Sequence, residues 1–281
     1  MSPTRHALSL SDIDLSYLEW NPGGEPVLLL HGLGDHALVW AKLGEDLSDR
    51  YHVVAPDLRG HGESSKPESG YRSEEIIADL EGLMDRLGWS SAHVVGHSWT
   101  GKLVPIWARQ NSARVRSMVL IDPFFIDRIP GWFRITFPLL YRVLPFLKGM
   151  GPFESYEDAE RQARQLKQYR GWTPLQQAVF RGGVEPKPDG RWGSKFTVAA
   201  RNGIFEDVMQ AAGLTEEIAI PTLFVKPEAG LNRTAWQLQP YYKYLTNLQV
   251  RELPGNHWIF LVEPEVCNQA IKGFLDDRSS S

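Results

Sequence analysis

Short apolar runs alternate with longer amphipathic stretches along most of this chain, and this alternation restricts the possible folds more than any other feature. The runs are rich in Val, Leu and Ile, and turn residues bound them. They are apolar on both faces, which is typical of buried parallel strands. They cover residues 25–32, 51–57, 92–98, 115–123, 220–228 and 248–256. Between them, residues 73–88 and 101–115 have helical spacing. Strands that alternate with helices predict an α/β fold with an open, mostly parallel sheet.

Two regions depart from this alternation. Residues 8–20 alternate apolar and polar side chains, as an antiparallel hairpin at a sheet edge does. Residues 124–214 contain no strand-like run, so we expect a core of residues 1–123 and 215–281 with a mostly helical cap inserted over 124–214. Helical patterns within the insertion cover residues 131–147 and 156–169. Such a cap would lie over the carboxyl ends of the strands, where α/β folds bind ligands.

Composition and charge exclude several classes of function. The formal net charge is −4 and the basic residues are scattered, so we expect no nucleic-acid partner. No window approaches the roughly 18 apolar residues of a membrane span, and the first residues lack the features of a signal peptide. We therefore expect a cytoplasmic protein without a membrane partner. The one cysteine, Cys267, is expected to be a buried thiol, and Asn232 begins a glycosylation sequon that matters only after secretion. No feature decides the oligomeric state.

The segment VVGHSWTGKL, residues 94–103, joins a strand to a helix through a short turn. Gly96 ends the apolar run, Ser98 follows, and helical spacing begins directly afterwards. This order is typical of a nucleophile elbow, in which a serine hydroxyl stands above the sheet beside the N-terminus of a helix. Thr100 takes the place of the last glycine of G-x-S-x-G, and Gly101 follows one residue later. The spacing alone also fits a strand-to-helix turn with an inert serine.

Two further segments favour a catalytic role for Ser98. Residues 31–34 follow a strand directly, as does the loop that supplies oxyanion donors, so the backbone N–H groups of Leu33 and Trp99 are candidates for an oxyanion hole. His257 lies in a loop after the last strand and is the candidate general base. His97, beside the serine, is either a pocket residue or a packed neighbour. Candidate residues of a substrate pocket are Gly32, His97, Phe124 and Trp258.

The chain resembles the α/β-hydrolase family over nearly its whole length. The matching segments are HGLG (31–34), APDLRGHGES (55–64), GHSWTG (96–101), VLIDP (119–123) and GNHWIFLVEPE (255–265). The resemblance implies an eight-stranded core flanked by helices, with a helical cap and a catalytic triad in the chain order Ser, acid, His. It assigns Ser98 as nucleophile and His257 as general base. It gives Asp57, Gly60 and Gly62 an architectural role at turns.

The resemblance leaves the acid of the triad open. The family usually carries an aspartate in the loop after the strand over 220–228, but Gly230 stands at that place. Asp122, at the end of the strand over 115–123, is one alternative, since several haloalkane dehalogenases take their acid from this position. Glu228 is the other, because its longer side chain could reach His257. Of the two we favour Asp122.

The serine also distinguishes this chain from part of the family. The triplet HSW resembles the HDW of haloalkane dehalogenases and epoxide hydrolases, where an aspartate attacks an alkyl carbon. Ser98 would form an ether there, which offers water no carbonyl to attack, so we predict neither activity. The sequence instead predicts a serine hydrolase that cleaves a small carboxylic ester through an acyl-enzyme, with no cofactor and no metal. A carbon–carbon bond hydrolase, a lactonase or a slow-turnover small-molecule receptor would use the same residues.

Overall fold

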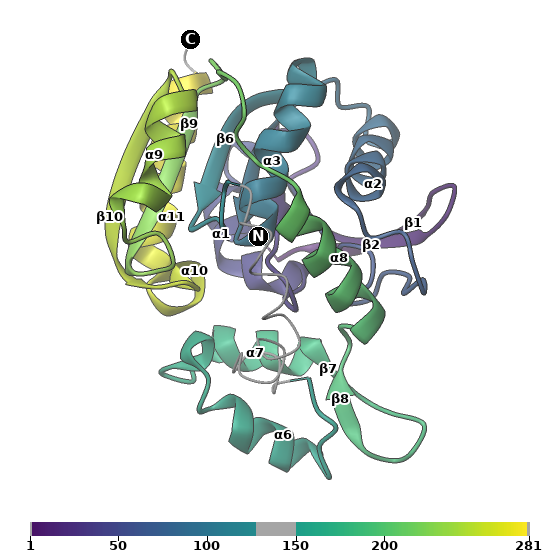
Figure 1. Cartoon of the computed structure of the whole chain (residues 1–281). Coiled ribbons are helices and arrows are strands. Elements are labelled where there is room, and N and C mark those ends of the chain that lie inside the picture. The colour runs from purple at the N-terminus through teal and green to yellow at the C-terminus, as the bar shows by residue number, and fades with distance from the viewer. Residues whose placement is uncertain (1, 128–149, 280–281) are drawn as a thin grey trace.

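An eight-stranded sheet lies at the centre of the computed structural model, which describes residues 2–127 and 150–279. Its order is β1-β2-β4-β3-β5-β6-β9-β10 (Figure 1). β1 pairs with β2, and β2 with β4, in antiparallel fashion, while all other neighbours are parallel. The α/β fold and the edge hairpin are thus confirmed. The strands are β1 (Thr4–Ser9), β2 (Asp14–Trp20), β3 (Glu25–Leu30), β4 (Tyr51–Pro56), β5 (Ala92–His97), β6 (Val115–Ile121), β9 (Thr222–Ala229) and β10 (Leu248–Asn256).

Helices cover both faces of the sheet, which explains why the strands are apolar on both sides. Val94 packs in one buried cluster with side chains of α2 and α3, and its neighbour Val95 packs in another with side chains of α1 and α11. The helices around the sheet are α1 (Ala41–Leu47), α2 (Ser73–Arg86), α3 (Trp99–Gln110), α9 (Ala235–Tyr244), α10 (Ile259–Val262) and α11 (Pro264–Ser279). Short 3-10 helices are η1 (Ala37–Trp40), η2 (Ser112–Arg114) and η4 (Lys167–Tyr169). Cys267, in α11, is fully buried as expected.

The described part of the insertion lies largely at one end of the molecule (Figure 1). It contains α6 (Tyr156–Ala163) and α7 (Pro174–Gly183), while the helix predicted over residues 131–147 lies outside the described residues. The expectation of no strand here is wrong, because β7 (Val184–Pro186) pairs with β8 (Trp192–Ser194). Each strand has only three residues, too few for a periodic pattern, and Gly190 turns the chain between them at φ +83°.

Helix α8 (Val198–Gln210) is the last described helix before β9 and packs against α2 and α3. Ile204 and Val208 belong to the same buried cluster as side chains of α2 and α3. Lys102 of α3 donates a hydrogen bond to the carbonyl oxygen of Val208 at 2.7 Å, and Ser73 N–H donates to Asp207 at 3.1 Å. Polar contacts thus join α8 to two core helices.

The architectural role expected for the loop after β4 is visible in its contacts. The carboxylate of Asp57 accepts hydrogen bonds from the N–H groups of Ala37 (2.7 Å) and Glu63 (3.0 Å). Gly60 and Gly62 have φ of +80° and +49°, and a Cβ on Gly62 would lie 2.4 Å from the Asp57 carboxyl carbon. Positions 60 and 62 of this loop therefore fit only glycine.

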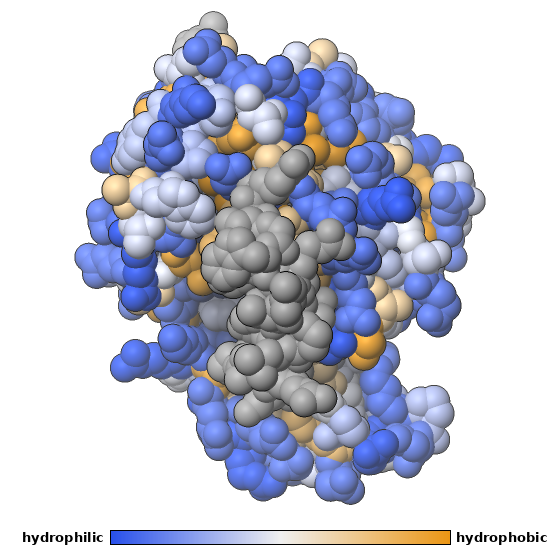
Figure 2. Space-filling view, viewed as in Figure 1, coloured by the Kyte–Doolittle hydropathy of each residue, from blue (hydrophilic) through white to orange (hydrophobic). Residues whose placement is uncertain are grey.

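Polar and charged residues cover most of the face seen in Figure 2. In residues 2–127 and 150–279, no helix combines the length and the apolar character needed to cross a membrane.

Candidate active site

Ser98 lies at a sharp turn between β5 and α3. Its backbone has φ 60° and ψ −117°, a strained conformation for a residue with a side chain, and α3 begins at the next residue. Gly96 permits the turn, since a Cβ there would lie 2.7 Å from the carbonyl oxygen of Thr100. This is the strand–turn–helix geometry of a nucleophile elbow.

Thr100 replaces the usual glycine without opening the turn. Its hydroxyl oxygen accepts a hydrogen bond from the N–H of His97 at 2.9 Å. The same hydroxyl lies 2.9 Å from the carbonyl oxygen of Leu30, to which its O–H can donate. Thr100 therefore joins the ends of β3 and β5 directly beneath the turn.

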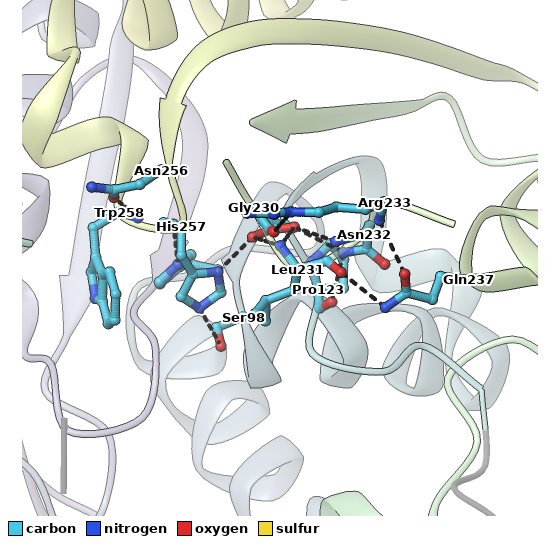
Figure 3. Close-up of polar contacts among 12 residues, drawn as sticks. Ser98, Pro123, Gly230, Leu231, Asn232, Arg233, Gln237, Asn256, His257 and Trp258 are labelled. Atoms are coloured by element: carbon cyan, nitrogen blue, oxygen red, sulfur yellow. Dashed lines mark hydrogen bonds and ion pairs between the residues drawn. The ribbon is translucent and has the colours of Figure 1, made fainter. Parts of the chain in front are cut away.

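Ser98, His257 and Asp122 form one chain of hydrogen bonds. The Nε2 atom of His257 lies 3.0 Å from the hydroxyl of Ser98 (Figure 3). The Nδ1 atom of His257 lies 2.6 Å from Oδ2 of Asp122. The Asp122 carboxylate is an acceptor, so Nδ1 carries the proton and Nε2 is free to accept one from the serine. The Asp122 side chain is fully buried, whereas that of His257 is 13% exposed.

The loop after β9 holds Asp122 with further donors. Leu231 N–H donates to Oδ2 at 2.8 Å, and the side-chain amide of Asn232 donates to Oδ1 at 2.9 Å. Burial alone would raise the pKa of Asp122, but the hydrogen bonds from His257, Asn232 and Leu231 outweigh it and lower the pKa below its usual value. The carboxylate therefore stays ionised beside the imidazole.

Sequence reasoning missed Asn232 as a functional residue and noted only its sequon. Its side chain is 2% exposed and donates to Asp122, so in the folded chain it is not an accessible glycosylation site. One signal could have revealed it: it lies two residues beyond the place where related proteins carry their acid.

The structure separates the two candidate acids. It places Asp122 against His257, whereas Glu228, near the end of β9, is exposed. Gly230 makes room for this arrangement, because a Cβ there would lie 2.6 Å from Oδ2 of Asp122. In related proteins the loop after β9 carries the acid. In this chain the same loop donates hydrogen bonds to Asp122, which follows β6.

The two candidate oxyanion donors lie next to Ser98. Neither Leu33 N–H nor Trp99 N–H donates to another described residue. Trp99 is the first residue of α3, so its N–H has no partner within the helix, and Leu33 follows β3. Both residues line the same cavity as Ser98, which leaves them available to an oxygen bound there.

A cavity of about 470 Å³ contains Ser98 and His257 in its wall. Three predicted pocket residues, His97, Phe124 and Trp258, are among the described residues that line it, and Gly32 is not. Gly32 instead lies behind His97, where a Cβ would be 2.6 Å from the Nδ1 atom of that ring. Apolar side chains form much of the wall, namely Phe124, Ile204, Phe205, Val208 and Leu231.

His97 is both a pocket residue and a packed one. Its Nε2 donates to the backbone carbonyl of His257 at 2.9 Å, and the two rings are 4.5 Å apart. Its Nδ1 lies 3.6 Å from Oδ2 of Asp35. Burial and the neighbouring His257 lower the pKa of His97. His97 thus connects the elbow to the loop that carries His257.

In the described parts of the chain, no three or more His, Cys, Asp or Glu side chains are grouped so that they could hold a metal ion.

Comparison with known proteins identifies the family of the fold. The family model for the alpha/beta hydrolase fold matches residues 25–264, so the chain belongs to this family. It is similar to the 2-(acetamidomethylene)succinate hydrolase of Mesorhizobium japonicum, with 28% identity over 90% of this chain and 88% of the relative. It is also similar to a fluoroacetate dehalogenase of Burkholderia sp, with 26% identity over 92% and 89%.

Solved structures agree as well. The crystal structure of E-2-(acetamidomethylene)succinate hydrolase superposes with a TM-score of 0.80 and 25% identity, covering 98% of this chain and 99% of that one. These relatives act on small molecules, and they support hydrolase activity for this chain.

Proposed function

We propose that this protein is a cofactor-independent serine hydrolase that cleaves a carboxylic ester. Ser98 is the nucleophile, His257 the general base and Asp122 the acid. The observation that carries the proposal is the unbroken hydrogen-bonded chain from Asp122 (2.6 Å) through His257 to Ser98 (3.0 Å) at a strained turn. The order of the three residues in the chain is the one the family uses.

In the proposed reaction the Ser98 hydroxyl attacks the ester carbonyl while His257 takes its proton. The N–H groups of Leu33 and Trp99 stabilise the resulting oxyanion. Asp122 stabilises the positive charge of the imidazolium, which then gives its proton to the leaving alcohol. Water activated by His257 attacks the acyl-enzyme, which releases the acid and restores Ser98.

The proposal excludes the dehalogenase and epoxide hydrolase reactions. Ser98 attacking an alkyl carbon would leave an ether, and water has no carbonyl to attack in an ether. We therefore expect no steady release of halide or diol, although one curated relative is a fluoroacetate dehalogenase.

The 2-(acetamidomethylene)succinate hydrolase acts, by its name, on a succinate, which carries two carboxylates. Among the described residues that line the cavity of this chain, Lys167 is the one Lys or Arg, and Asp35 adds a carboxylate. We therefore do not extend that substrate to this chain.

A fluorophosphonate probe tests the proposal directly, because it phosphonylates only an activated serine. We expect mass spectrometry to find the label on Ser98, and Ser98→Ala to abolish both labelling and turnover of p-nitrophenyl esters. Ser90→Ala, at an exposed serine after α2, is the matched control and should keep both. A folded protein that takes no label contradicts the proposal, and labelling with negligible turnover favours the receptor alternative.

A further inference from the structure

A second cavity, of about 300 Å³, adjoins the one that contains Ser98. The described residues that line both define what we call the waist: Leu33, Asp35, Gln165, Leu166, Gln168 and Trp258. Beyond the waist, the described wall includes apolar side chains, among them Phe153, Val179, Phe180 and Phe196. The chamber around Ser98 is therefore apolar, and the one beyond the waist is mixed, because His36, Gln162, Tyr169 and Ser194 also line it. Leu33, a candidate oxyanion donor, lies at the waist itself.

Asp35 is the one acidic residue among the described residues that line either cavity. Its side chain is 10% exposed, and its Oδ2 atom is buried without a hydrogen-bond partner among the described residues. Because Oδ2 is buried, a ligand can reach only the other part of the carboxylate.

His97 does not satisfy this carboxylate in the structure. Its Nε2 proton is committed to the carbonyl of His257, and its Nδ1 is 3.6 Å from Oδ2 and is itself without a partner among the described residues. Gly32 packs against the same oxygen, because a Cβ at that position would lie 3.0 Å from Oδ2 of Asp35. The part of Asp35 that a ligand can contact is therefore the part that lines the two cavities.

We propose that Asp35 determines the specificity of this site, by accepting a hydrogen bond from an O–H or N–H group of the substrate at the waist and disfavouring a carboxylate there. The inference rests on the proposed function. It gives the substrate class as a carboxylic ester with a hydrogen-bond donor between an apolar arm in the Ser98 chamber and a second arm beyond the waist. The donor binds the part of the carboxylate that faces the cavities, since Oδ2 itself is buried.

The test compares p-nitrophenyl esters whose acyl chains have equal length and end in a methyl, a hydroxyl or a carboxylate group. We expect wild-type kcat/KM to be at least about tenfold higher for the hydroxyl-ended than for the carboxylate-ended ester. Asp35→Asn keeps the volume and an acceptor oxygen but removes the charge. It should bring this ratio close to one, chiefly by raising kcat/KM for the carboxylate-ended ester. The methyl-ended ester should change little.

Asp189→Asn, in the exposed turn between β7 and β8, is the matched control and should leave the ratio unchanged. Fluorophosphonate labelling of Ser98 in each variant separates the two proposals. Labelled, active enzyme with the same ratio in Asp35→Asn overturns the specificity proposal alone. So does a wild-type preference for the carboxylate-ended ester, which decides the matter even if the variant does not fold. Absence of both labelling and turnover overturns the proposed function.

Discussion

The hydrogen-bond donors to Asp122 come from residues distant in the chain. This residue follows β6, yet its donors come from His257 and from the loop after β9. A carboxylate fixed in this way keeps the imidazole in the tautomer that can accept the serine proton. The catalytic value of each candidate acid can therefore be measured by removing its charge without removing its volume.

We predict that Asp122→Asn lowers kcat by on the order of ten-thousand-fold, because an amide in its place favours the wrong tautomer of His257. Glu228→Gln, the matched change at the exposed alternative, should stay within about threefold of wild type. Steady-state hydrolysis of one p-nitrophenyl ester gives both values. The reverse ranking would make Glu228 the acid, and two near-normal variants would contradict the triad.

At the scale of elements, α8 is joined to α3 through one buried cation. Lys102 is 1% exposed, and its ammonium donates to the carbonyl oxygens of Val208 (2.7 Å) and Asp127 (3.0 Å). Asp127 lies just after β6, and Val208 lies near the end of α8. The position of α8, which lines the Ser98 cavity through Ile204, Phe205 and Val208, therefore depends on Lys102.

We predict that Lys102→Met lowers the free energy of unfolding by about 1–3 kcal/mol, because it leaves the buried carbonyl of Val208 without its donor. Hydrogen exchange should show the largest loss of protection in α8. Lys42→Met, which removes a partly exposed lysine paired with Asp46 in α1, serves as the control and should change the stability by less than about 1 kcal/mol. Equal protection of α8 in Lys102→Met and wild type would show that apolar packing alone positions the helix.

Some elements of the fold could be predicted from the sequence and others could not. Each of the six core strands carries its own apolar run, so these strands and the edge hairpin could be predicted locally. The expectation of burial on both faces is wrong for β10, an edge strand whose residues are all half-buried or exposed. Strands β7 and β8 could not, since three residues hold no period. The acid could not be decided either. Asp122 directly follows β6 and Glu228 lies near the end of the adjacent strand β9, so the sequence does not show which carboxylate meets His257. The contacts of Asn232 and Asp35 depend on residues far away in sequence.

At the scale of the whole molecule, two buried carboxylates connect distant parts of the chain. Asp57 binds Arg5 of β1 at 2.7 Å as well as the N–H groups of Ala37 and Glu63. Burial alone would raise the pKa of Asp57, but the charges of His36 and Arg5 and these N–H groups outweigh it and lower the pKa. Asp122 is lowered in the same way.

These lowered pKa values give the fold a defined acid sensitivity. A carboxyl group whose folded pKa lies below its unfolded value of about 3.9 stabilises the fold above that pH, and the stabilisation is lost as the pH falls through the folded pKa. We predict that the urea midpoint falls more steeply below about pH 4 in the wild type than in Asp122→Asn. Asp79 and Asp207, whose pKa values burial raises, act in the opposite sense but are common to both proteins. Parallel curves would contradict the prediction.

The close approach of residue 230 to Asp122 has a consequence for how such proteins diverge. The two positions lie after adjacent strands, β6 and β9, and a side chain added at Gly230 would begin where the Asp122 carboxylate already is. A carboxylate at one place beside His257 can thus come from either of two positions in the sequence, 122 or 230, and both precede His257. A lineage can therefore transfer its charge from one strand to the other by two compensating substitutions, with the histidine and the serine left in place. Glycine at position 230 therefore indicates that the carboxylate comes from position 122.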